Sequence, residues 1–114
     1  MVKRLTYATT TLLLDDATAD TVIDYAAALS TTGLSHPVHL EGLTSSGAIS
    51  KVTLLLHGHV SLTAEDTAAV DTEVPSNTDA RDWMRSEINR IRYRPMARAE
   101  TREEIGAAEF TLLD

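Results

Sequence analysis

The chain has 114 residues, of which 43% are hydrophobic and 24% charged, with no cysteine and a formal net charge of −7. This length fits one domain that can bury a core without disulfide or metal staples. The composition excludes collagen, disulfide scaffolds and wholesale disorder, and the lack of cysteine excludes a thiol nucleophile and a cysteine-based zinc site.

The first third of the chain predicts two short strands and a helix. Residues 2–7 and 10–14 are rich in Thr, Leu and Tyr, which favour strands, and the chain is expected to turn near Ala8. Asp15 and Asp16 can cap the helix predicted over residues 17–30, whose apolar side chains recur on one face. Gly33 is expected to end this helix in the left-handed conformation.

The middle of the chain predicts a hairpin. Residues 38–43 and 49–57 favour strands, and the glycine-containing segment 44–48 between them favours a turn. Residues 52–56 are nearly continuous in apolar character, which predicts a central strand. Thr63 and Asp66 have the spacing of a helix cap, so a short helical turn is expected from there to Val70.

The last part of the chain predicts a linker and a second helix. Residues 71–79 are polar and contain Pro75, and Ser76 and Asp79 resemble a capping box. Apolar residues recur at helical spacing over 79–93, and Pro95 is expected to end that helix, with only a weak helix after residue 96.

Together these elements predict an α+β fold. We expect a small, mostly antiparallel sheet of about four strands in ββαββ order, with one helix packed on a face and a C-terminal helix after an acidic linker. Residues 1–70 would form the α+β core, and 71–114 the linker and arginine-rich helical extension, as one domain overall.

Charge is divided unevenly along the chain. Residues 1–80 carry three basic side chains against ten acidic ones, whereas residues 81–98 carry six arginines against two acids. Such an arrangement predicts attraction between the acidic body and the basic segment, within one molecule or across a homo-oligomer. A contact between the arginines of 81–98 and a nucleic acid is the alternative.

One part of the chain resembles a known group of proteins. The segment 14–29 with its LDD-ATAD sequence, followed by the apolar patterns of 38–43 and 52–56, resembles small uncharacterised actinobacterial proteins over about residues 5–60. The resemblance implies a strand-rich N-terminus, a helix and a hairpin. Since that family has no assigned function, it brings no site residues.

The four histidines are the strongest indication of chemistry. His57 and His59 are two residues apart, so they share a face of a regular strand, and His39 on the neighbouring strand could join them. With Glu41 these side chains would make a valid zinc or iron shell. A small metalloenzyme built on His39, His57 and His59 is therefore a second alternative, although histidines at strand ends more often face solvent.

Contact with another protein is the function that the sequence favours most. The chain has no P-loop, no dinucleotide-binding fingerprint and no nucleophile elbow, so no cofactor is expected and nothing argues for an enzyme. It also lacks a signal peptide or an apolar run long enough for a membrane helix, which predicts a soluble, cytoplasmic protein. We expect a non-catalytic protein-interaction or homo-oligomerisation module, most simply a homodimer. The residues expected to carry the interaction are those of the apolar stripe and its basic flank: Trp83, Met84, Ile88, Ile91, Arg81, Arg85 and Arg92.

Overall fold

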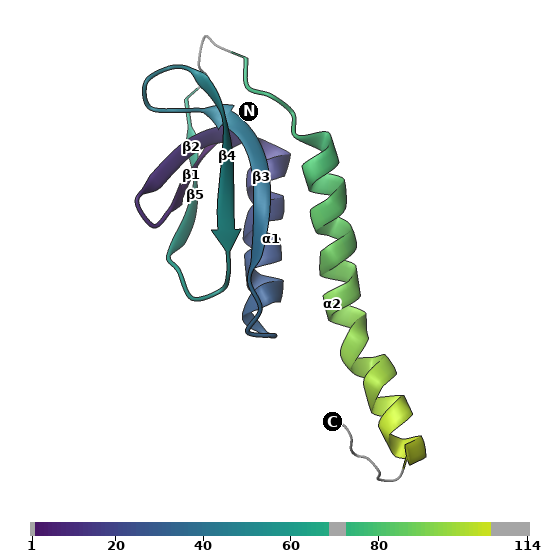
Figure 1. Cartoon of the computed structure of the whole chain (residues 1–114). Helices are drawn as coiled ribbons and strands as arrows, with labels where there is room; N and C mark the ends of the chain where they lie inside the picture. The colour runs from purple at the N-terminus through teal and green to yellow at the C-terminus, as the bar shows by residue number, and fades with distance from the viewer. Residues whose placement is uncertain (1, 69–72, 106–114) are drawn as a thin grey trace.

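The computed structural model describes residues 2–68 and 73–105, with the side chains of the last helix described as far as Tyr93. It contains a five-stranded antiparallel sheet in the order β4-β3-β2-β1-β5 and two helices (Figure 1), which confirms the α+β class. The elements are β1 (Val2–Tyr7), β2 (Thr10–Asp15), α1 (Asp16–Ser30), β3 (His36–Leu43), β4 (Ile49–Leu56), β5 (Leu62–Thr67) and α2 (Thr78–Ile105).

The first five elements follow the predicted order. Strands β1 and β2 form a hairpin that turns at Ala8, which takes a positive φ of 56°. Asp15 caps α1 by accepting a hydrogen bond of 3.2 Å from the backbone N–H of Thr18. After the helix, Gly33 adopts φ 73° and donates its N–H to the carbonyl of Leu29, so the predicted left-handed ending is confirmed.

The sheet bends sharply between β2 and β3. These strands share a single paired position, Leu13 with Leu43, whereas β3 and β4 pair along their whole length. At the bend β2 lies very close to β3. A Cβ on Gly42 of β3 would stand 2.6 Å from a side-chain carbon of Leu12 on β2, which explains why β3 has a glycine at this position. The bend brings the two ends of the sheet together: the hydroxyl of Tyr7 on β1 donates to the carbonyl of Leu55 on β4, at 2.5 Å.

Two predictions for the middle of the chain are wrong. β4 lies at the edge of the sheet and not at its centre. Its apolar run does not indicate a central strand, because the run is divided between two faces: Leu54 and Leu56 are buried, whereas Leu55 is 58% exposed. Residues 62–67 form β5 and no helical turn, and Val70 lies outside the described residues. Asp66, interpreted as part of that cap, instead lies opposite Lys3 of β1 at 3.9 Å, and its neighbour Glu65 accepts a hydrogen bond from Arg4.

The second helix packs on the same face of the sheet as the first. Figure 1 shows α2 running alongside α1 and β3 and then projecting beyond both. It begins at Thr78 and continues past Pro95 to Ile105, so the prediction that the proline ends the helix is wrong. Proline removes one helical hydrogen bond and crowds one carbonyl, which a long helix can absorb with a local kink.

Candidate interaction surface

The apolar stripe of α2 is used inside the molecule. Met84, Ile88 and Ile91 are 0%, 1% and 9% exposed, and they belong to the cluster that also holds Tyr25 of α1 and Leu40 of β3. Three of the residues expected to meet a partner therefore complete the core of their own chain. Without α2, the inner face of β3 and the neighbouring face of α1 would be left uncovered, which explains why the helix packs there.

Trp83 lies at the rim of this contact and is 40% exposed. Its ring stacks on His36 of β3 at a centroid distance of 5.5 Å and meets the edge of Tyr25 at 5.7 Å. Tyr25 is fully buried and its hydroxyl has no hydrogen-bond partner among the described residues. Burial and the nearby carboxylate of Glu87 raise the pKa of Tyr25 to about 12. The aromatic cluster therefore joins α1, α2 and β3.

The arginines of α2 are partly engaged within the chain. Arg85 donates to Asp24 of α1 at 2.9 Å, which agrees with the expected attraction between the acidic body and the basic segment. Arg90 forms a 2.6 Å ion pair with Glu87, and Arg81 donates to the hydroxyl of Thr78. Arg92, also predicted for the interaction, is exposed. The ion pairs partly neutralise the positive charge that a nucleic-acid contact would need.

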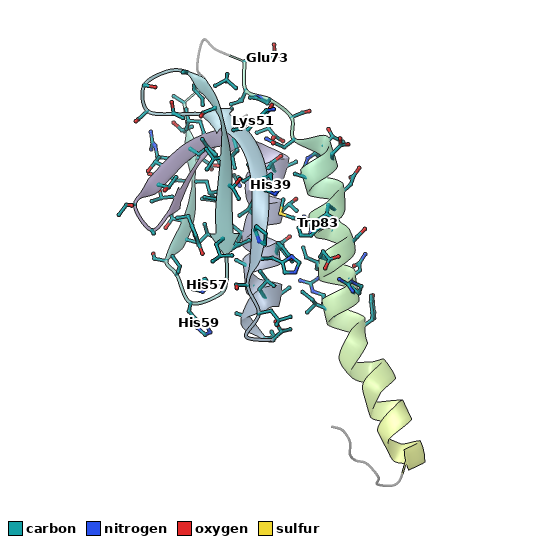
Figure 2. The ribbon with its side chains drawn as sticks, viewed as in Figure 1. His39, Lys51, His57, His59, Glu73 and Trp83 are labelled. Carbon is teal, nitrogen blue, oxygen red and sulfur yellow. The ribbon has the colours of Figure 1, made fainter. Side chains whose placement is uncertain are left out.

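The structure does not bring together the three histidines of the metalloenzyme alternative. Figure 2 shows His39 part-way along β3, away from His57 and His59, which lie in the loop after β4. His57 and His59 are near each other, with ring centroids 6.1 Å apart, but His39 bonds instead with the hydroxyl of Thr53 at 2.9 Å. Over residues 2–68 and 73–93, where side chains are described, no group of three His, Asp or Glu could hold an ion. The expected strand geometry fails because β4 ends at Leu56 and the chain turns at Gly58.

Asn77 is a structural residue that the sequence did not reveal. Its side-chain amide donates to the carbonyl of Glu41 and accepts from the N–H of Glu41, both at 2.8 Å, as a neighbouring strand would. The predicted capping box is absent from the start of α2, where the Ser76 hydroxyl instead contacts that of Thr78. The polar Ser-Asn-Thr segment indicates hydrogen bonding to the backbone, but only the fold shows that the Asn77 amide reaches β3.

The sheet has two edge strands, β4 and β5, and of these β4 is the one that exposes large apolar side chains. Among the described residues β4 pairs with β3 alone, and four of its side chains alternate on the face opposite the helices. They are Ile49, Lys51, Thr53 and Leu55, all exposed, with exposed fractions of 45% for Ile49 and 58% for Leu55. Large apolar side chains on an unpaired edge strand mark a surface that is prone to pair with another strand.

The same four residues also direct their backbone groups outward. The N–H of Thr44 bonds to the carbonyl of Ala48, and hydrogen-bonded pairs alternate along an antiparallel hairpin. Pairs Gly42–Ser50, Leu40–Val52, Val38–Leu54 and His36–Leu56 are therefore the bonded ones. Pro37, which has no N–H, lies opposite Leu55 at a non-bonded position, as this alternation requires. The peptide groups of Ile49, Lys51, Thr53 and Leu55 thus face away from β3.

We call the outward-facing residues 49, 51, 53 and 55 the β4 edge. This edge carries little net charge although the chain is strongly acidic. Lys51 is its one ionic side chain, and Glu41 on the adjacent strand lies 4.0 Å from it. A second strand would therefore approach this edge without meeting the excess negative charge of the body.

No protein-family model, curated protein or solved structure matches the chain. None of the helices in the described part of the chain combines the length and the apolar character needed to cross a membrane. A function for the chain therefore has to be inferred from its own geometry.

Proposed function

We propose that this chain is a non-catalytic protein-interaction module that self-associates as a homodimer through the β4 edge. The observation that carries the proposal is a regular eight-residue edge strand, without proline, that pairs with β3 alone among the described residues and exposes two large apolar side chains. Of its outward peptide groups, the carbonyl of Leu55 accepts from Tyr7, and those of Ile49, Lys51 and Thr53 remain for a second strand. Main-chain hydrogen bonds supply affinity at such an edge, and the side chains on the strand supply specificity.

The helix stripe first expected to make this contact supports the proposal in a different way. Because α2 closes the core over α1 and β3, its apolar stripe is covered, and the helix leaves the outer edge of β4 accessible. The strand is already formed by its pairing with β3, so a second strand would bind an ordered edge, which lowers the entropy cost of association.

Light scattering at tens of micromolar tests the proposal directly. Wild-type protein is expected to be dimeric, and Leu55→Lys to be monomeric, because the ammonium group would replace an apolar contact at the β4 edge. Leu34→Lys is the matched control, since Leu34 is 47% exposed but lies in the turn after α1. A monomeric wild type, or equal dimerisation of all three proteins, would contradict the proposal.

A further inference from the structure

We infer that the second copy pairs antiparallel with β4 in one register, centred on Val52, to make a continuous ten-stranded sheet. This inference rests on the proposed self-association and names its geometry. A two-fold axis through the edge requires that each outward-facing residue meets another outward-facing residue. That condition leaves only a few registers for residues 49–55.

Side-chain chemistry chooses among these registers. Centring the axis on Val52 places Ile49 opposite Leu55 of the second copy, so that the two exposed apolar side chains cover each other. The same register sets Lys51 opposite Thr53. Centring on Lys51 would oppose two ammonium groups directly, and centring on Thr53 would set Leu55 against Lys51.

The Val52 register also uses the most backbone groups. All four outward-facing residues enter hydrogen-bonded pairs, and each such pair exchanges two hydrogen bonds. The carbonyl of Leu55 already accepts from Tyr7, but a carbonyl oxygen has a second lone pair. If the axis moved by one residue, one of the four outward-facing residues would no longer lie opposite the β4 strand of the second copy.

The edge fits a second copy better than a charged peptide. Its single lysine is balanced by Glu41, so it offers no net charge to attract an acidic or a basic segment. The two apolar side chains lie symmetrically about Val52, which is the pattern that an isologous contact requires.

Cross-linking tests the register, because the chain contains no cysteine of its own. In the proposed dimer the two copies of Val52 form a non-hydrogen-bonded pair with Cα atoms about 4.5 Å apart, within the range of a disulfide. Val52→Cys is expected to form a disulfide-linked dimer under mild oxidation. Ser50→Cys is the matched control on the same face, since its two copies would lie roughly 13 Å apart and should not link.

A second pair of variants avoids the half-buried position of Val52. Ile49→Cys and Leu55→Cys are both at exposed positions, and their Cα atoms would lie about 5.5 Å apart across the interface. Each variant alone should stay unlinked, and a mixture of the two should form the cross-linked heterodimer.

The outcomes separate the register from the self-association. Linking of Val52→Cys and of the mixture, with none for Ser50→Cys, is the expected result. If light scattering shows a dimer but Ser50→Cys links as readily, or the mixture does not link, the register is overturned while self-association stands. If the wild type is a monomer and no variant links, both are overturned.

Discussion

The packing of α2 on α1 and β3 covers the apolar stripe of the helix, which leaves the β4 edge as the surface available to a partner. Ile88 is 1% exposed and belongs to the core cluster with residues of α1 and β3. Ile88→Ala removes three buried carbons and leaves a cavity, and such changes cost about 2–5 kcal/mol in protein cores. We expect a loss near the middle of that range, about 3 kcal/mol, in the free energy of unfolding.

A loss of this size corresponds to a fall in Tm of roughly 15 °C for a domain of about 100 residues. The measurement is urea unfolding followed by circular dichroism and by the fluorescence of Trp83, the single tryptophan. Because Trp83 stacks on His36, its emission reports whether α2 is docked. Ser86→Ala, at an exposed position of the same helix, should change stability by less than about 0.5 kcal/mol. Equal stability of the two variants would refute the packing of α2 on its own chain.

Three further predictions follow from single contacts. Asn77→Ala should lower the free energy of unfolding by about 2 kcal/mol, measured by urea titration, because it removes both hydrogen bonds to the Glu41 backbone; wild-type stability would contradict it. Gly42→Ala should lower Tm by several degrees, since its Cβ would stand 2.7 Å from the carbonyl oxygen of Leu13, and an unchanged melting curve would refute the close approach. The pKa of Tyr25 is near 10 in the unfolded chain and about 12 in the folded one. Its neutral hydroxyl therefore contributes about 2–3 kcal/mol to the free energy of unfolding below pH 10, and this contribution is lost as the pH rises toward 12. Tyr25→Phe should lack this loss in alkaline unfolding experiments, and an identical pH profile would contradict the assignment.

Local signals predicted the first half of the fold well. The Asp15 cap, the ending at Gly33 and the two hairpins depend on neighbouring residues, so the sequence pattern was sufficient there. The wrong predictions of secondary structure concern segments whose conformation depends on residues distant in the sequence. Thr63 and Asp66 have the spacing of a cap, but pairing with β1 over six residues outweighs a single capping bond.

The candidate site was harder to predict for the same reason. The stripe of α2 has the same pattern whether it packs on its own chain or on a second copy, and only the uncovered faces of α1 and β3 decide between these. The apolar run of β4 concealed its place at the edge, since an exposed Leu55 and a buried Leu54 cannot be distinguished by composition. The histidine hypothesis failed because Gly58 turns the chain before a common strand face can form.

Amide hydrogen exchange of β4 at two protein concentrations distinguishes a β4 edge that pairs with a second copy from one that stays free. The backbone N–H groups of Ile49, Lys51 and Thr53 face away from β3, so they should exchange rapidly in dilute protein and slowly at tens of micromolar and above. Those of Val52 and Leu54 bond within the hairpin and should be protected at both concentrations. Rapid exchange of the three outward amides at every concentration would contradict pairing through the β4 edge.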